Sequence, residues 1–554
     1  MNSTPERRRA LVSGGASVAV LLALALALPA YVLRSHSRES GAGAAIDEEP
    51  FESARQSPPR AGGVTRARDE ELGRRIGELI EKSEAASARW GVHVVSLRDA
   101  RVLYERDARR LFAPASNMKL YTTAVALELL GAGHRWRTSV YAAAGADAAG
   151  TIKGDLVLYG RGAPDLSSRA APGRGSQLSE LADKLYARGV RRVRGDVVGD
   201  ESFFRGEALG AGWLWEDVQW YYGAEPSALS IDDNEVALAV APGKEVGAAA
   251  EVESLPALEQ IRVTNELQTI ERGARGSMGI TRELSSNAVR VWGELPAGGS
   301  SYKVRLSVRR PALVAASLFR DALGARGIEV AGTARVVDAR TPLGARLDTA
   351  GAVELASVTS ATLGEVVRET NKKSLNLQAE LLLRTLGRER GDTAPDPDPE
   401  RMRRRDTDAA GLAVVRCWLE SAAGAEPGAL DLRDGSGLSR LNRVTPEATT
   451  RLLGRMSRSP SAALFRASLP VAGRDGTLER RLRRSNAAGR VAAKTGSFTH
   501  VGALSGYALT ADGEPLAFSV ICNDDTGGSS ERVIDSIVTL LSAYPDAEKA
   551  VSRK

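Results

Sequence analysis

A serine and a lysine three residues apart, Ser116 and Lys119, constrain this chain more than any other feature of its sequence. They stand just after Pro114, at the head of an apolar-rich stretch that ends near Gly131. Proline is tolerated at the start of a helix and glycine is common beyond its end, so the sequence predicts a helix over residues 116 to 130. Residues three apart share one face of a helix, which would place the Lys119 amine beside the Ser116 hydroxyl.

Such a pair can serve nucleophilic catalysis. A serine hydroxyl is a poor nucleophile until a base takes its proton, and a desolvated lysine can be that base. The Ser-x-x-Lys pattern carries little weight alone, because it arises often by chance. Its interpretation therefore depends on the rest of the chain.

Two further short motifs follow Ser-x-x-Lys. A Ser-Leu-Asn triplet at 374–376 lies in a stretch with helical periodicity, and a Lys-Thr-Gly triplet at 494–496 ends a predicted strand. Ser-x-x-Lys, Ser-x-Asn and Lys-Thr-Gly, in this order, are the motif set of penicillin-recognising acyl transferases. The ordered set favours one active site assembled from three distant parts of the chain.

Longer stretches around these motifs make the chain similar to one family. It reads Asp-Gly-Ser-Gly-Leu-Ser-Arg over 434–440, Leu-Pro-Val-Ala-Gly over 469–473 and Ala-Leu-Ser-Gly-Tyr over 503–507. A long insertion after the first motif contains Trp-Leu-Trp-Glu-Asp at 213–217. The chain thus resembles the D-alanyl-D-alanine carboxypeptidase/endopeptidase family, the class C low-molecular-mass penicillin-binding proteins, over about residues 75 to 545.

The resemblance implies an α/β (α+β) fold, a serine β-lactamase/transpeptidase-like catalytic domain with strand-rich domains inserted after the Ser-x-x-Lys helix. We expect a discontinuous catalytic domain over 71 to 140 and 346 to 546, and an inserted region over 141 to 345. Short β-like runs between close turns mark the inserted region as a separate unit. Periodicity predicts helices over 362 to 386, 406 to 422, 446 to 457 and 530 to 543, and strands over 491 to 494, 503 to 510 and 515 to 522.

The resemblance also implies the roles of the catalytic residues. Ser116 would attack the carbonyl of a D-Ala-D-Ala peptide bond and form an acyl-enzyme. Lys119 would be its general base, which requires a pKa depressed by burial near Lys494. Ser374 would relay a proton to the departing D-alanine nitrogen, and Asn376 would hold Lys119 and a substrate amide.

Binding roles follow from the same resemblance. Lys494 and Thr495 would bind the terminal carboxylate, and Gly496 would let the strand approach the substrate. The backbone N–H groups of Ser116 and Ser497 would form the oxyanion hole. The resemblance implies no cofactor and no metal.

Three further residues, Arg440, Asp200 and Phe204, are expected to contact the stem peptide, near its diaminopimelate end. The expected partners are peptidoglycan stem peptides ending in D-Ala-D-Ala and β-lactam antibiotics. Leu375 stands where the family commonly has an aspartate, and we expect it to tune activity without abolishing it.

The N-terminus indicates export. Three arginines at 7–9 precede the uncharged stretch from Leu11 to Leu33, which is long enough to cross a bilayer with its N-terminal end in the cytoplasm. Its length favours an uncleaved anchor, while a break at Pro29 allows a cleaved signal peptide over 1 to 35. Residues 36 to 70 are expected to be a flexible tether, and 547 to 554 a tail. The catalytic part would then lie in the periplasm or another extracytoplasmic part of the cell envelope.

Charge and cysteine content restrict the partners. The chain has 75 basic and 69 acidic residues, a net charge of +6, and no basic block interleaved with aromatic residues, so nucleic-acid binding is not expected. Cys417 and Cys522 could pair in an oxidising compartment or remain isolated buried thiols. Oligomeric state stays open, as does the balance of carboxypeptidase, endopeptidase and transpeptidase activity.

Three other functions are weaker. A Ser-His-Asp hydrolase has only four histidines to draw on, at 36, 93, 134 and 500, and His500 alone is near a motif, as a rim residue. The acidic run at 232–235 could bind a cation, although a solvated turn is the favoured interpretation. A non-catalytic penicillin sensor or envelope scaffold would not need the complete motif set.

Overall fold

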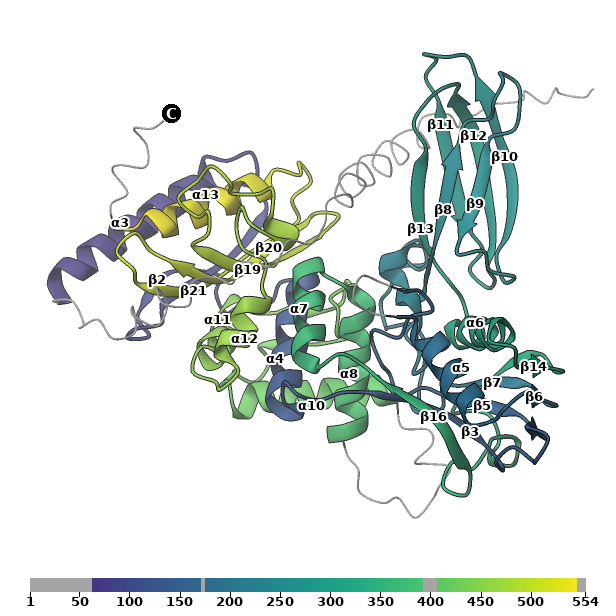
Figure 1. Cartoon of the computed structure of the whole chain (residues 1–554). Coiled ribbons are helices and arrows are strands. Elements are labelled where there is room, and N and C mark those ends of the chain that lie inside the picture. Colours follow the sequence, from purple (N-terminus) through teal and green to yellow (C-terminus); the bar gives the residue numbers. More distant parts are fainter. Residues whose placement is uncertain (1–61, 171–174, 392–405, 546–554) are drawn as a thin grey trace, which may run out of the picture. The chain divides into compact units, whose positions relative to one another are not determined.

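The computed structural model of the chain describes residues 62–170, 175–391 and 406–545. A five-stranded antiparallel sheet organises its catalytic part, in the order β19-β20-β21-β1-β2 (Figure 1). The N-terminal hairpin thus joins the C-terminal strands through the β1–β21 pair. The strands are β1 (Arg89–Ser96), β2 (Val102–Arg106), β19 (Val491–Phe498), β20 (Val501–Leu509) and β21 (Pro515–Asn523).

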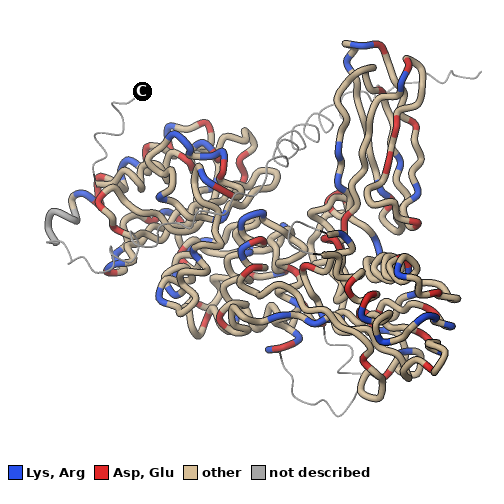
Figure 2. The backbone as a smooth tube through the Cα atoms, in the orientation of Figure 1, with Lys and Arg blue, Asp and Glu red and all other residues tan. Residues whose placement is uncertain are grey.

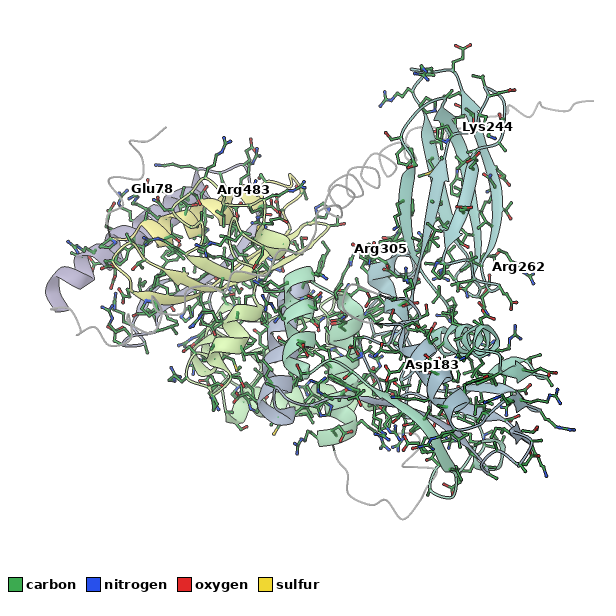
Figure 3. The ribbon with its side chains drawn as sticks, in the orientation of Figure 1. Glu78, Asp183, Lys244, Arg262, Arg305 and Arg483 are labelled. Atoms are coloured by element: carbon green, nitrogen blue, oxygen red, sulfur yellow. The ribbon has the colours of Figure 1, made fainter. Side chains whose placement is uncertain are left out.

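Helices cover both faces of this sheet. α3 (Gly62–Glu81) and α13 (Ser530–Ala543) pack on one face, around a core that includes Trp90 and Phe518. Because both faces are covered, every residue of β21 is buried, which accounts for its continuous apolar run. The outer side of α3 is polar: Glu78, labelled in Figure 3, is on this helix, and its carboxylate pairs with Lys82 at 3.0 Å.

A helical layer packs on the other face, and α4 lies within its core. From Met118 to Leu127 every residue of α4 is buried, as expected of a helix that is apolar all round. The predicted helices and strands of the second catalytic segment are confirmed, with one break described below. The helices of the layer are α4 (Met118–Leu130), α7 (Leu363–Lys373), α8 (Asn376–Arg390), α10 (Thr407–Ser421), α11 (Pro446–Met456) and α12 (Ala462–Ser468).

The insertion between α4 and α7 contains a second five-stranded sheet, in the order β15-β7-β5-β3-β16, with helices α5 (Gln177–Ala187) and α6 (Pro311–Ala325). It begins at Arg137 and ends at Thr359, so it extends beyond the range 141 to 345 at both ends. The strands are β3 (Arg137–Ala142), β5 (Leu156–Tyr159), β7 (Val197–Asp200), β15 (Ala334–Val337) and β16 (Val353–Thr359), with a small sheet of β4 (Thr151–Ile152), β6 (Arg192–Val193) and β14 (Glu329–Val330).

Residues 236–306, within the insertion, form a compact unit of their own. It consists of two three-stranded sheets, in the orders β13-β8-β9 and β10-β12-β11. The strands are β8 (Glu235–Ala241), β9 (Glu251–Leu255), β10 (Arg262–Ile270), β11 (Ser277–Arg282), β12 (Ala288–Pro296) and β13 (Tyr302–Ser307).

Helical structure begins within the range that was predicted to be a flexible tether. α3 begins at Gly62, inside the range 36 to 70, because Asp69 ties this region to the domain. The Asp69 carboxylate accepts from the Tyr544 hydroxyl at 2.6 Å and pairs with Arg101 at 2.9 Å. The predicted N-terminal segment, the rest of the tether and the tail from 547 lie outside the described residues. Within the described ranges, no helix is long and apolar enough to span a membrane.

The described part of the chain has charged residues of both signs and two free cysteines. Basic and acidic positions are interspersed along the described backbone (Figure 2). Cys417 and Cys522 are both free: Cys417 is exposed on α10 and Cys522 is buried in β21. The expectation of two buried thiols therefore holds for Cys522 alone.

Candidate active site

The Ser-x-x-Lys pair lies at the start of α4. Ser116 sits in a short 3-10 turn, Ala115–Asn117, that leads directly into the helix. Lys119 follows in the first turn of α4, and its Nζ lies 2.9 Å from Ser116 Oγ. The predicted helix is confirmed, except that its first turn is 3-10. A buried helix holds the pair more rigidly than a loop would.

Lys119 makes three short polar contacts and is 0% exposed. Besides Ser116 Oγ, its Nζ contacts Asn376 Oδ1 at 2.6 Å and the Ser436 carbonyl at 2.7 Å. A neutral amine has two N–H groups, so it can donate one to the Asn376 oxygen and one to the Ser436 oxygen. The lone pair would then face Ser116 Oγ, as a general base requires.

Burial makes this neutral form accessible near neutral pH. Desolvation lowers the pKa of Lys119 to about 7, while the carboxylates of Asp434 and Glu380 oppose that shift. The pKa of Lys494, also fully buried, is lowered by desolvation and by the charge on Lys119. Two buried lysines that disfavour each other's charge make one neutral amine the expected state.

Acylation of Ser116 is therefore expected to depend on pH through Lys119. With a pKa of about 7 for Lys119, the acylation rate constant should rise with pH and level off above that value. At pH 5 only about one Lys119 amine in a hundred would be neutral, so acylation should be about a hundredfold slower than on the plateau. Stopped-flow acylation by a chromogenic β-lactam measures this profile, with circular dichroism as a control for folding. A flat profile between pH 5 and 8 would contradict a lysine base.

The second motif lies where one helix ends and the next begins. Helical periodicity predicts one continuous helix over 362 to 386, but α7 ends at Lys373 and α8 starts at Asn376. Ser374 between them has a positive φ of 59°, a conformation that is unusual for any residue other than glycine. The break lets Asn376 contact Lys119 while its Nδ2 donates to the Tyr222 carbonyl at 2.8 Å.

The third motif lies on β19. Lys494 Nζ donates to Ser374 Oγ at 2.9 Å and to the Thr495 carbonyl at 2.8 Å, so it joins the second motif to the third. Gly496 lies against the backbone that carries Ser116: a Cβ there would be 2.6 Å from the Pro114 carbonyl oxygen. Glycine is therefore required for this close approach.

β19 is an edge strand, and part of its outer side is open. Near its start, Ala493 N donates outward to the Pro470 carbonyl at 2.9 Å. Alternate residues of a strand direct their backbone groups to the same side, so Thr495 and Ser497 also direct theirs outward. The Ser497 N–H thus lies on the side of the strand where the predicted oxyanion hole needs it.

The loop 434–439 is a part of the site to which the sequence assigned no role. It supplies the Ser436 carbonyl that contacts Lys119, and the short strands β17 (Leu430–Asp431) and β18 (Arg443–Val444) flank it. Glu380, 1% exposed, fixes the loop by accepting from the Gly435 and Ser436 N–H groups at 3.0 and 2.8 Å. The Asp-Gly-Ser-Gly motif can be recognised in the sequence, but its contact with Lys119 exists only in the folded chain.

Comparison with known proteins identifies the family. The sequence profile of the D-Ala-D-Ala carboxypeptidase 3 (S13) family matches residues 72–544. The chain belongs to this family. The predicted resemblance is thereby confirmed.

Known relatives of this S13-family chain cover most of its length. A D-alanyl-D-alanine carboxypeptidase of Actinomadura sp. (strain R39) is 36% identical over 497 residues, 88% of this chain and 87% of the relative. The D-alanyl-D-alanine carboxypeptidase DacB of Haemophilus influenzae is 26% identical over 459 residues, 82% of this chain and 89% of the relative. The crystal structure of penicillin binding protein 4 (dacB) from Haemophilus influenzae matches with a TM-score of 0.71 at 24% identity, over 85% of this chain and 98% of that one. The expected fold class is confirmed.

Arg440 is the predicted stem-peptide residue that lies beside a motif of the S13-family site. Its guanidinium stacks over the Phe498 ring, 4.7 Å from the ring centroid, at the end of β19. Its Nη1 is 3.3 Å from Asp217 Oδ2, and the Tyr222 hydroxyl donates to the same carboxylate at 3.3 Å. The acidic residue of the insertion that reaches Arg440 is therefore Asp217.

Asp200 and Phe204 lie elsewhere in the S13-family chain. Asp200 ends β7, is 2% exposed and accepts from the Ser202 N–H at 2.8 Å. Phe204 is 8% exposed and packs against Leu377 and Leu381 of α8. Neither makes a described contact with a motif side chain, and their contact with the stem peptide stays a prediction.

The described histidines do not serve Ser116. His93 is buried and hydrogen-bonded to Thr450, while His500 is exposed in the β19–β20 turn, against the Asp525 carbonyl. His134 packs edge-on against Trp136. These positions remove the basis for a Ser-His-Asp hydrolase. His36 lies outside the described residues.

The acidic run at 232–235 forms a turn within the insertion. Hydrogen bonds to other residues of the insertion hold this turn, whereas a solvated turn was expected. Asp232 accepts from the Ser167 hydroxyl at 2.7 Å and from the Ser168 N–H at 3.1 Å. Asn234 is fully buried and donates to the Glu225 carbonyl at 2.8 Å. These hydrogen bonds give Asp232 and Asn234 protein partners within the turn.

Proposed function

We propose that this chain is a serine-type carboxypeptidase that removes the terminal D-alanine from peptidoglycan stem peptides and is acylated by β-lactams. The observation that carries the proposal is the buried Lys119 Nζ, 2.9 Å from Ser116 Oγ. Membership of the D-Ala-D-Ala carboxypeptidase 3 (S13) family supplies the bond that such a pair would cleave.

Acylation begins with proton transfer from Ser116 to neutral Lys119. Asn376 and the Ser436 carbonyl hold the two amine protons, so the lone pair accepts the third. Ser116 Oγ then attacks the carbonyl of the D-Ala-D-Ala bond. The N–H groups of Ser116 and Ser497 bind the developing oxyanion.

The leaving D-alanine nitrogen takes a proton from Ser374, and Ser374 is reprotonated by the proton that Lys119 removed from Ser116, so Lys119 is neutral again when the acyl-enzyme has formed. Lys494, 2.9 Å from Ser374 Oγ, supports that transfer, and its charge together with the Thr495 hydroxyl binds the terminal carboxylate. Water then hydrolyses the acyl-enzyme and restores Ser116. A β-lactam ring opens at the same serine, but its amine stays attached, so the adduct is hydrolysed slowly.

The open side of β19 suits an extended peptide. The backbone groups of Thr495 and Ser497 point to that side, and a peptide that adds to a sheet edge gains main-chain hydrogen bonds. Its scissile carbonyl would then lie beside Ser116, because Gly496 already contacts the turn that carries this serine.

Mass spectrometry of the products tests the proposal. Incubation with a pentapeptide ending in D-Ala-D-Ala is expected to give a tetrapeptide and free D-alanine, and a fluorescent penicillin is expected to label the folded chain. Purified sacculi separate hydrolysis of crosslinks from trimming of pentapeptides, since acyl-enzyme chemistry is common to both. A folded chain that neither labels nor releases D-alanine would instead indicate a scaffold.

Arg440 is proposed to bind the charged end of the stem-peptide side chain. Arg440→Ala is expected to lower kcat/KM about ten- to a hundredfold for a peptide with a diaminopimelate side chain. Acylation by benzylpenicillin, which lacks that group, should change little. Arg433→Ala, at an exposed arginine nearby, is the matched control. Equal losses with both compounds would make Arg440 a purely structural residue.

We propose that the protein is exported to the cell envelope, based on the arginines at 7–9 and the uncharged stretch from Leu11 to Leu33. N-terminal sequencing of the protein purified from its native envelope distinguishes an anchor from a cleaved signal peptide. An intact chain recovered from the cytoplasm would overturn the proposal.

A further inference from the structure

Thr495 has a partner that none of the three motifs contains. Thr477 Oγ1 lies 2.8 Å from Thr495 Oγ1. Thr477 belongs to a 3-10 turn, Gly476–Leu478, in the loop between α12 and β19. A hydroxyl has one proton and two lone pairs, so a proton donated by Thr477 leaves the Thr495 proton free for another acceptor.

A half-buried ion pair fixes the loop that carries Thr477 to α7. Lys372 Nζ donates to the two carboxylate oxygens of Asp475 at 2.7 and 2.6 Å, and to the Leu469 carbonyl at 2.6 Å. Lys372 lies in the last turn of α7, immediately before the segment that carries Ser374. The loop is therefore attached to the end of α7 that precedes the second motif.

Backbone pairing fixes the same loop to β19. Ala472 N donates to the Val491 carbonyl at 3.0 Å, and Ala493 N donates to the Pro470 carbonyl at 2.9 Å. At the turn itself, a Cβ on Gly476 would be 2.7 Å from the Lys372 carbonyl oxygen, so a side chain would push the turn away. These contacts hold Thr477 at a fixed place beside Thr495.

We propose that Thr477 is a positioning residue for Thr495, and that this hydroxyl pair makes the site prefer substrates with a free C-terminal carboxylate. The inference rests on the proposed function, in which Thr495 binds that carboxylate. Thr477 donates to Thr495 Oγ1, and the Thr495 proton is thereby directed to the carboxylate. A chain of two hydroxyls ending on an anion strengthens each of its hydrogen bonds.

The test compares acyl donors that differ only in the terminal carboxylate. One pair is a D-Ala-D-Ala peptide and its C-terminal amide; the other is benzylpenicillin and its methyl ester. Thr477→Val keeps the shape and removes the hydroxyl, while Thr477→Ser keeps the hydroxyl. Thr264→Val, at an exposed position of β10, is the control for the Thr→Val change itself.

Thr477→Val is expected to lower kcat/KM for the carboxylate peptide, and the acylation rate with benzylpenicillin, by about tenfold. The amide and the ester should lose little, so the preference for a carboxylate falls by the same factor, and Thr477→Ser should restore it. Equal losses for the carboxylate and neutral compounds, or no loss, would overturn the inference.

The two proposals fail in different ways. Wild-type protein that releases no D-alanine would overturn the proposed function. The penicillin pair still tests Thr477 in that case, because it requires only acylation. An active wild type with an unchanged carboxylate preference in Thr477→Val would overturn the inference alone.

Discussion

Replacing Ser116 by alanine is expected to abolish acylation and D-alanine release. No other described hydroxyl lies within hydrogen-bonding distance of Lys119 Nζ, so no neighbouring group can take over as nucleophile. Loss of a nucleophilic serine costs roughly a millionfold in kcat in a serine peptidase. Fluorescent-penicillin labelling and intact-protein mass spectrometry measure the covalent step directly.

A matched serine variant separates chemistry from folding. Ser421 on α10 donates only to the Cys417 carbonyl one turn earlier, so Ser421→Ala should label like the wild type. Ser116→Ala should keep the wild-type melting temperature, since Ser116 is only half-buried. Persistent labelling of folded Ser116→Ala would place the nucleophile elsewhere.

Replacing Lys119 by arginine is expected to slow acylation about 10²- to 10⁴-fold, the usual contribution of a general base. A guanidinium stays protonated and therefore cannot accept the Ser116 proton. The rise of the rate with pH around 7 should disappear in the same variant, because that rise reports the Lys119 amine. Stopped-flow acylation from pH 5 to 9 measures both effects.

Two controls accompany this prediction. Lys119→Met removes the amine and is one heavy atom shorter than lysine, which covers the case that the larger arginine disturbs the buried site. Lys373→Arg, at an exposed lysine of α7, controls for the substitution itself. Acylation of folded Lys119→Arg or Lys119→Met at the wild-type rate would exclude Lys119 as the base.

Local sequence patterns predicted most elements of the catalytic domain. The buried helix after Pro114, the strand that ends in Lys-Thr-Gly and the final helix all lie where apolar periodicity placed them. Periodicity did not show the break at Ser374, because both α7 and α8 continue the helical pattern. The positive φ of Ser374 is held by contacts with distant segments, which a local pattern does not contain.

Contacts between distant segments also decided which acidic residue lies beside Arg440. Asp217, and not Asp200, lies beside Arg440, because the chain before Tyr222 passes close to the second motif. Glu380 contacts Ser436, which is 56 residues away in the sequence, and Thr477 contacts Thr495, which is 18 residues away. No fixed spacing along the sequence predicts contacts between residues so far apart.

The sequence by itself determined the family of this protein and the chemistry proposed for it. Three ordered motifs predicted the nucleophile, the base and the carboxylate-binding strand, since each is a short string with a recognisable residue pattern. Tertiary structure alone decided how these groups act together. Burial lowers the pKa of Lys119 to about 7, Asn376 and Ser436 contact its amine, and Thr477 contacts Thr495. Desolvation and hydrogen-bond direction depend on what surrounds a side chain, and those surroundings exist only once distant segments have packed together.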